Sequence, residues 1–343
     1  MTLEYEKSPE SKNMNPQMSY PSFSMVIHWY DFEPSDIERP RKMLESVSKQ
    51  IISVSKNISV KPEVFVVYIA EETKNHVKDF IDEHLASIKS LVDLKLIPAY
   101  GFNKYNLRYF ALKNFAATHA SHEVLIFVDN DVIPDKDWLI GYLGEMKNPE
   151  TKMVAGNAYI LRNTISEKAF SLFWIFPPKD EIDDDSEKRY YHGNNLCIRR
   201  TVLEKIPFPN MASYHGQGLA HADTLRNQGI KLCYQPKASV EHPTPITFFE
   251  FFTKAMCWGH DLYMDKKLGN NVNVISDPNF NLNNRRSIRK FFSRIKFRHR
   301  NAGLNPITTI GSLGIITGFV GFIFLGYLLS SVYPSLIRNH LST

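Results

Sequence analysis

Short apolar runs alternate with amphipathic stretches over the first 130 residues of the chain. Runs rich in Val, Ile and Phe predict strands, and the stretches between them, with apolar residues three or four apart, predict helices. The predicted strands are residues 23–30, 63–70, 91–100 and 124–128, and the predicted helices are residues 36–52, 71–90 and 103–120. Strands that alternate with helices in this way are typical of an α/β fold, with a mostly parallel, Rossmann-like sheet covered on both faces.

The rest of the chain divides by pattern and charge. Residues 1–20 are polar and predict a flexible lead-in without a signal peptide, and residues 21–265 carry the predicted α/β domain. Within it, a strand is expected at 153–160 and a helix at 219–229, closed by Gly229. The acidic run Asp180–Arg189 between them is read as a solvated loop.

The C-terminal segment has a longer uncharged, apolar stretch than the helices of a globular core usually have. No Asp, Glu, Lys or Arg occurs between Asn301 and Ile337, and about 20 apolar residues suffice to span hydrocarbon. We therefore predict a transmembrane helix within residues 304–337; a buried core helix and a re-entrant hairpin are the alternatives. Gly314 and Gly318 form a GxxxG pair that could pack helices and allow homo-oligomers.

The net charge of +5 comes from one segment. Eight Lys and Arg residues between Arg285 and Arg300 leave the remainder at 5 − 8 = −3, so the composition does not indicate a nucleic-acid partner. Residues 266–303 are predicted to be a linker followed by a basic amphipathic helix lying on anionic membrane lipid. Its apolar positions are Ile288, Phe291, Phe292 and Ile295. The positive-inside rule then places the large domain in the cytoplasm.

The run Val124–Val128 leads directly into Asp129, Asn130 and Asp131. Two carboxylates held close together repel each other and need a positive partner. A divalent cation, Mg²⁺ or Mn²⁺, meets this need, because it takes one or two protein carboxylates and fills its shell with phosphate oxygens and water. The alternative is a capped turn that starts the following helix.

Several further motifs, in order, make the chain from about Ser22 to Pro245 resemble glycosyltransferase family 2, which has the GT-A fold. Tyr30 and Asp31 match the nucleotide loop after the first strand. Glu71 or Glu72 stands where the family contacts base and ribose, and Lys113 stands at a family Arg. The resemblance thus implies a nucleotide-sugar site made by Tyr30, Asp31, Glu71, Lys113 and Asp129.

The stretch "HGNNLCIRR" closely matches the family loop beside donor sugar and acceptor, which gives that role to Gly193, Asn194 and Asn195. The stretch ending in His242 matches a segment whose histidine is a further metal ligand. The resemblance therefore implies a metal shell of Asp129, Asp131 and His242.

One position departs from the family. Its Gly-Glu-Asp motif, whose Asp is the general base, falls on Gly216, Gln217 and Gly218, where no carboxylate stands. The nearest candidates are His221 and Asp223. Asp223 is preferred because a carboxylate beside a cationic site stays ionised and can accept a proton. An exposed helical Asp and a structural His are the alternatives.

The activity implied is inverting transfer of a sugar from a nucleotide-sugar donor to a hydroxyl of a glycan or lipid-linked acceptor, as in polysaccharide biosynthesis. A haloacid dehalogenase phosphatase is disfavoured, because Ile133 stands where that class needs a small hydroxyl residue. A nucleotidyltransferase is disfavoured because residues 29–40 contain no glycine. A catalytically inactive, membrane-bound nucleotide-sugar-binding protein is the remaining alternative.

Overall fold

The computed structural model describes residues 19–29, 37–70, 76–102, 109–181, 191–211, 214–268, 293, 295–300, 302 and 304–341. Its strands are β1 (Phe23–Trp29), β2 (Glu63–Ile69), β3 (Asp93–Ala99), β4 (Val124–Asp129), β5 (Ile133–Pro134), β6 (Met153–Tyr159), β7 (Asn195–Arg199) and β8 (Leu232–Glu241). Its main helices are α1 (Glu38–Val54), α2 (His76–His84), α3 (Tyr109–Ala117), α4 (Trp138–Met146), α5 (Ile165–Phe173), α6 (Arg200–Lys205), α7 (Gln217–Asn227), α8 (Phe248–Leu268), α10 (Pro306–Val332) and α11 (Pro334–His340).

The strands form a single eight-stranded sheet in the order β3-β2-β1-β4-β7-β6-β8-β5. β1 to β4 are mutually parallel, as the alternating pattern predicts, and β6 is parallel to β8. β7 is antiparallel to β4 and β6, and β5 is antiparallel to β8. The carboxyl ends of β1, β4, β6 and β8 and the start of β7 therefore lie at one edge of the sheet.

Side chains of the buried strands alternate between two apolar cores. In β4, Val124, Ile126 and Val128 belong to the core that also contains α1, α2 and α4. Leu125 and Phe127 belong to the opposite core, which contains α3 and α7. Period-two alternation then places Asp129, at the end of the strand, on the α3 side.

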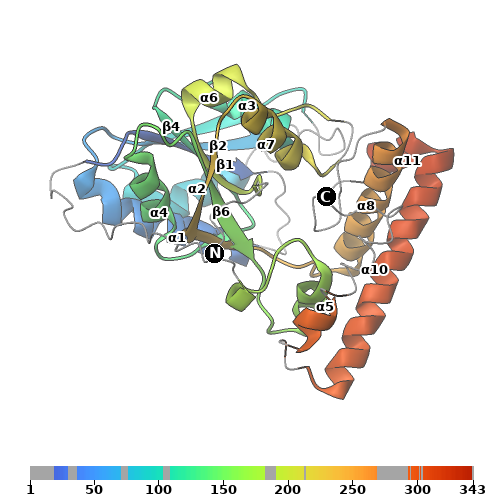
Figure 1. Cartoon of the computed structure of the whole chain (residues 1–343). Helices are drawn as coiled ribbons and strands as arrows, with labels where there is room; N and C mark the ends of the chain where they lie inside the picture. Colours follow the sequence, from blue (N-terminus) through green and yellow to red (C-terminus); the bar gives the residue numbers. More distant parts are fainter. Residues whose placement is uncertain are drawn as a thin grey trace, which may run out of the picture.

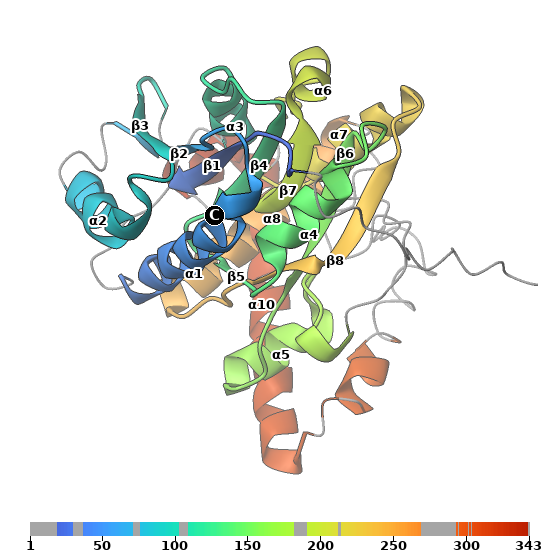
Figure 2. The ribbon, with the colours of Figure 1, turned by 90° about the vertical axis from the view of Figure 1, so that its left-hand side faces the viewer.

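The predicted strands agree with the structure to within two residues at each end. The helices predicted at 36–52 and 219–229 are displaced by two residues from α1 and α7, and those predicted at 71–90 and 103–120 extend beyond α2 and α3. Residues 71–75 and 103–108, which we assigned to helices, lie outside the described residues. The fold class is confirmed as α/β with helices on both faces of the sheet (Figures 1 and 2).

The C-terminal helices form a layer beside the sheet domain. Figure 1 shows α10 along the outer edge of the molecule, with α8 and α5 between it and the sheet. By length and composition α10 is long and apolar enough to cross a membrane, with a mean hydropathy of 2.0. Most of the predicted amphipathic segment, including Ile288, Phe291 and Phe292, lies outside the described residues.

Close contact between α8 and α10 is made by glycines other than those that the sequence singled out. A Cβ built on Gly259 would lie 2.1 Å from the carbonyl oxygen of Ile323, and one on Gly326 would lie 2.3 Å from that of Met256. Gly314 has nothing within 4 Å of such an atom. The two helix backbones therefore touch at Gly259 and Gly326.

Candidate active site

Most of the predicted site residues within the described chain meet at the carboxyl edge of the sheet. Asp129 ends β4, and Asp131 lies just beyond it. Gly193 and Asn194 precede β7, whose first residue, Asn195, is paired with Val128. His242 follows β8. Ligands of open α/β sheets bind at such an edge.

Asp129 has a positive partner within the protein. Its Oδ1 lies 2.5 Å from Nζ of Lys113, and its Oδ2 accepts a hydrogen bond of 2.6 Å from the Tyr109 hydroxyl. Tyr109 and Lys113 are four residues apart on α3, so they project from one face of that helix. Nδ1 of His28, at the end of β1, lies 3.6 Å from the same Oδ1.

This cluster is closed off from solvent, with Lys113 0% and Asp129 4% exposed. Burial alone would raise the pKa of Asp129, but the charge of Lys113 and the contact with His28 lower this pKa to about 2. Burial, followed by the charge of Lys113, lowers the pKa of His28. Burial also lowers the pKa of the Lys113 ammonium, and the charge of Asp129 opposes this shift. The cluster is thus a buried Asp129–Lys113 pair beside a neutral imidazole.

Lys113, which the resemblance assigns to the nucleotide-sugar site, has partners within the protein: its ammonium contacts Asp129 and lies 4.5 Å from the centre of the Tyr109 ring. Its contact with the donor stays a prediction. The carboxylate of Asp129 likewise has both oxygens engaged by protein groups. These contacts fix the direction of Asp129 before any ligand arrives.

Arg39 links the segment after β4 to the end of β8. Its guanidinium donates from Nε to the backbone oxygen of Asp131, and from Nη2 to the backbone oxygen of Glu241 at 3.0 Å. Antiparallel pairing also sets Ile133 opposite Glu241. The backbones at Asp131 and at Glu241, the residue before His242, are therefore held near each other.

His242 presents one ring nitrogen in a form that suits a metal. Its Nδ1 lies 2.7 Å from the carbonyl oxygen of Pro243, which can only accept, so Nδ1 carries the proton and Nε2 keeps its lone pair. The ring stacks on Phe176 at 4.0 Å and meets Trp174 edge-on at 5.4 Å. Burial lowers the pKa of His242 well below its usual value, which keeps the ring neutral.

Within the described ranges, no group of three or more His, Cys, Asp or Glu side chains is placed to hold a metal ion. Asp131 and His242 are the predicted ligands at this edge. The donor types nevertheless fit a hard divalent cation that shares its shell with phosphate oxygens. The metal shell that includes Asp129 stays a prediction.

The predicted glycine loop contains three residues with three different environments. A Cβ on Gly193 would lie 2.6 Å from the Phe110 ring and 2.8 Å from the Tyr109 ring, so only glycine lets the loop approach α3 this closely. Asn195 is fully buried, and its side chain makes four hydrogen bonds. These run from the side chains of Trp138 and Tyr142 and to the backbone oxygens of Asn157 and Ala238.

Asn194 is buried as well, but its Oδ1 has no hydrogen-bond partner among the described residues. A buried amide oxygen without a donor costs about 1–3 kcal/mol. Such a group at a ligand edge is suited to accept from a sugar hydroxyl. Asn194 is thus the loop member with free bonding capacity, and Asn195 is the one that holds the loop in place.

The two candidate bases lie on α7 in contrasting surroundings. His221 is 1% exposed, its Nε2 lies 2.7 Å from the backbone oxygen of Ile206, and its Nδ1 lies 2.5 Å from the Tyr191 hydroxyl. Both ring nitrogens are therefore used inside the protein. The Asp223 side chain is 58% exposed and forms an ion pair with Arg226 one turn later.

Tyr30, Asp31 and Glu71 lie outside the described residues, so their predicted contacts with the nucleotide stay predictions. The sequence reasoning missed Tyr109, His28 and Arg39. Tyr109 carried a usable signal, because it lies one helical turn before Lys113. Arg39 carried none, since its partners Asp131 and Glu241 are distant in the chain.

The chain is similar to known glycosyltransferases in part of its sequence and in its fold. Residues 77–207 match the family model described as Glycosyl transferase family 2. The solved mannosyltransferase PcManGT from Pyrobaculum calidifontis, in complex with GDP-Man and Mn²⁺, has a TM-score of 0.54 at 14% identity, over 93% of this chain and 89% of that chain. The structure of GalNAc-T7 with UDP, GalNAc and Mn²⁺ has a TM-score of 0.47 at 14% identity, over 81% of this chain and 55% of that chain. No curated protein matches the chain.

The sheet and the likeness in fold to the mannosyltransferase define an α/β protein of the GT-A class. Residues 77–207 match the glycosyltransferase family 2 model, and this match supports a glycosyltransferase. The family resemblance predicted from the sequence motifs is thereby confirmed.

Proposed function

We propose that this glycosyltransferase inverts the anomeric centre as it moves a sugar from a nucleotide-sugar donor to a hydroxyl of a glycan or lipid-linked acceptor, with Mg²⁺ or Mn²⁺ as cofactor. The observation that carries the proposal is that Arg39 bonds the backbone oxygens of Asp131 and of Glu241, the residue before His242, at the carboxyl edge of the sheet. Asp131 and His242 are thereby proposed to supply an anionic and a neutral metal ligand at the edge where a donor diphosphate would lie.

Asp131 and His242 would hold the cation, which when bound supplies positive charge to the departing nucleoside diphosphate. The mannosyltransferase with the same fold was solved with Mn²⁺ and a nucleotide-sugar, which supports this choice of cofactor and donor class. Asp131 is the more important of the two, because a carboxylate offsets the ion's charge and an imidazole does not.

The donor would lie between β1, β4 and the loop before β7. Tyr30, Asp31 and Glu71 are proposed to contact the nucleotide, and Asp129 the sugar or ribose hydroxyls and part of the metal shell. The proposed role of Lys113 is to position Asp129, which in turn would contact the donor. Asn194 is proposed to accept a hydrogen bond from the donor sugar through its free Oδ1.

In the transfer step, the acceptor oxygen bonds to the anomeric carbon while the bond from that carbon to the diphosphate oxygen breaks. The acceptor proton passes to a base. Asp223 is the proposed base, because its carboxylate is exposed, whereas both nitrogens of His221 are engaged. Membrane lipid is a further proposed partner, through α10 and the basic segment that precedes it.

The test is release of nucleoside diphosphate from a panel of nucleotide-sugars, with Mn²⁺, with Mg²⁺ and after chelation. We expect release with at least one donor, dependent on the metal. Asp131→Asn should lower this release at least about a hundredfold. Asp137→Asn removes a carboxylate from an exposed position six residues further on and should leave the rate unchanged.

Two results would contradict the proposal. Full activity in Asp131→Asn would remove the metal assignment. Binding of a nucleotide-sugar without any release would favour the alternative of a protein that binds the donor without turnover, for which the absence of a carboxylate at Gly216–Gly218 is the supporting observation.

A further inference from the structure

α10 has two long faces with different surroundings. One face is covered by protein along its whole length, and its buried residues repeat at steps of four and three. They are Ser312, Ile316, Phe319, Ile323, Gly326 and Ser330. This spacing is that of a seam between packed helices. α10 is therefore docked on the enzyme and does not leave it at one end.

The covering helices are α5 and α8. A Cβ on Gly311 would lie 2.3 Å from Cδ1 of Ile165 in α5, and at the other end His260 of α8 lies 3.0 Å from the Ser330 hydroxyl. Gly311 and Ser330 are 19 positions apart along α10, which at 1.5 Å per residue corresponds to roughly 30 Å of helix. This length equals the hydrocarbon thickness of a bilayer.

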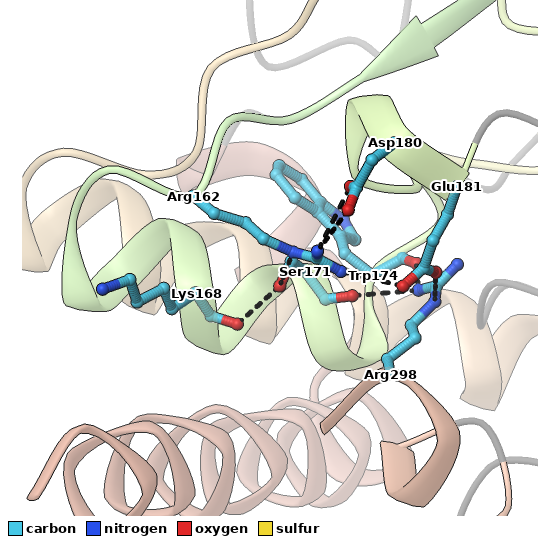
Figure 3. Close-up of polar contacts among 7 residues, drawn as sticks. All are labelled: Arg162, Lys168, Ser171, Trp174, Asp180, Glu181 and Arg298. Atoms are coloured by element: carbon cyan, nitrogen blue, oxygen red, sulfur yellow. Dashed lines mark hydrogen bonds and ion pairs between the residues drawn. The ribbon is translucent and has the colours of Figure 1, made fainter. Parts of the chain in front are cut away.

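The start of α10 is also tied to α5 by charged groups (Figure 3). Arg298, in the segment just before α10, donates to the backbone oxygens of Ser171 and Trp174 and pairs with Glu181 at 3.1 Å. Arg162 pairs with Glu181 at 2.8 Å. Arg298 is thus bound by the enzyme, whereas its membership of the basic segment had predicted a place among lipid headgroups.

Charged residues of α8 lie beside the C-terminal half of α10. Asp261 of α8 is fully buried and accepts hydrogen bonds from the backbone nitrogens of Tyr214 and His215. Lys266 of α8 donates to the Tyr327 hydroxyl of α10 at 3.2 Å. If α10 crossed the bilayer with this packing intact, these groups and the nearby sheet domain would enter hydrocarbon. Charged groups and non-helical backbone are costly there.

The opposite face of α10 is exposed and mostly apolar, with Thr317 and Ser331 as its hydroxyl residues. Its exposed large residues are Ile307, Ile310, Leu313, Val320, Phe324, Leu325, Leu328 and Val332. Phe248, at the start of α8, is 72% exposed and lies 5.9 Å from the Phe322 ring, so it extends this surface onto α8. Contiguous exposed apolar surface of this extent marks a site of membrane or protein contact.

We propose that α10 lies in the plane of the membrane surface, with its exposed face among the lipid acyl chains and its buried seam against the enzyme. The occupant is lipid, because the exposed face carries no charged side chain and the sequence that precedes α10 is rich in Lys and Arg. A helix that lies in the membrane interface normally has one polar face of its own. In this protein α5 and α8 cover the second face of α10 instead. Both ends of α10 then remain on the side of the catalytic domain.

The decisive experiment reads the side of the membrane on which each end lies. The full chain carries one epitope tag before residue 1 or after residue 343 and is expressed in cells from which sealed vesicles of both orientations are made. The proposal expects protease to remove both tags in one orientation and neither in the other, with detergent exposing all. Tags on opposite sides would establish a spanning helix and overturn the proposal.

A second measurement tests the face itself, without any assay of activity. Val320→Lys with Phe324→Lys should weaken binding of the full chain to phosphatidylcholine vesicles at least tenfold. Ile52→Lys with Val60→Lys makes the same change at two exposed apolar residues of the sheet domain and should leave binding unchanged. Unchanged binding in the first variant would overturn the proposal, as would a dimer that covers this face and binds no vesicles.

Discussion

Lys113 Nζ lies 2.5 Å from Asp129 Oδ1, and both side chains are withdrawn from solvent. Removing one partner of such a pair leaves the other charge buried and unpaired, which typically costs about 3–5 kcal/mol. We expect Lys113→Met to lower the free energy of unfolding by this amount, measured by denaturant titration. Lys95→Met breaks a pair whose lysine is 46% exposed and should cost less than about 1 kcal/mol.

The same pair explains a limit of sequence reasoning. The strand pattern predicted the carboxyl edge of the sheet, and Asp129 and Asp131 lie there in the structure, whereas a ligand at this edge stays a prediction. The positive partner of Asp129 was assigned to a metal, however, because Lys113 lies 16 residues earlier in the chain. Its contact depends on which face α3 covers and on which face Asp129 points to, and both are tertiary facts.

Neighbouring asparagines allow function and stability to be separated. Asn194→Ala removes an amide oxygen that has no partner in the part of the chain that the structure describes, so we expect little change in the free energy of unfolding and a KM for the donor raised about tenfold. Asn195→Ala leaves Trp138, Tyr142 and two backbone oxygens without partners, and should cost at least about 3 kcal/mol. Equal effects of the two changes on stability would contradict this division.

The identity of the base can be tested on α7. If Asp223 accepts the acceptor proton, Asp223→Asn should slow single-turnover transfer about a hundredfold or more. Glu204→Gln makes the matched change at an exposed carboxylate of α6, also paired with an Arg, and should leave transfer unchanged. His221→Gln should lower stability, because both ring nitrogens are bonded within the protein. Normal transfer in Asp223→Asn would move the role of base elsewhere.

A pH dependence of stability is expected from Glu63, which begins β2 at the edge of the sheet away from the site. Burial alone would raise the pKa of its carboxyl, but the Ser121 backbone N–H, the Ser24 hydroxyl and the Ser121 hydroxyl lower this pKa to about 2 from 4.5. A lowered folded-state pKa stabilises the fold above the unfolded value of 4.5 and loses that effect as the pH falls toward 2.

We therefore expect Glu63→Gln to lose up to about 3 kcal/mol of unfolding free energy at pH 7, and the difference from the natural chain to vanish between pH 4.5 and 2. Its sugar-transfer activity at neutral pH should be unchanged while the fold persists. Glu150→Gln, on an exposed turn, controls for the change in net charge. A difference that stays constant over this pH range would exclude the proposed origin.

The helix layer shows where sequence patterns stop being informative. α10 is apolar on all sides, so its sequence does not reveal which face meets α5 and α8. The GxxxG pair Gly314 and Gly318 was the visible packing signal, yet the backbones approach at Gly259 and Gly326. These two glycines lie 67 residues apart, 326 − 259, in two different helices, and no local spacing connects them.

This difference leads to a direct test of the docked arrangement of α10. A methyl group at Gly326 would meet the Met256 backbone at 2.3 Å, and one at Gly259 would meet the Ile323 backbone at 2.1 Å. Backbone cannot rotate away as a side chain can, so α8 and α10 must separate. We expect Gly326→Ala and Gly259→Ala each to cost about 1–3 kcal/mol, the usual range for overpacking.

The measurement is the thermal unfolding midpoint, followed by the fluorescence of Trp258, whose ring lies 5.6 Å from Phe319 of α10. Each variant should lower the midpoint by several degrees. Gly314→Ala adds the same methyl group to the same helix where nothing lies within 4 Å, and should raise stability slightly, because alanine favours helix over glycine by about 1 kcal/mol. If Gly326→Ala and Gly314→Ala had the same effect on stability, α10 would not be packed on α8. The proposal that α10 lies in the plane of the membrane surface would then lose its support, because a helix that is free of the enzyme could cross the bilayer without carrying the charges of α8 into it.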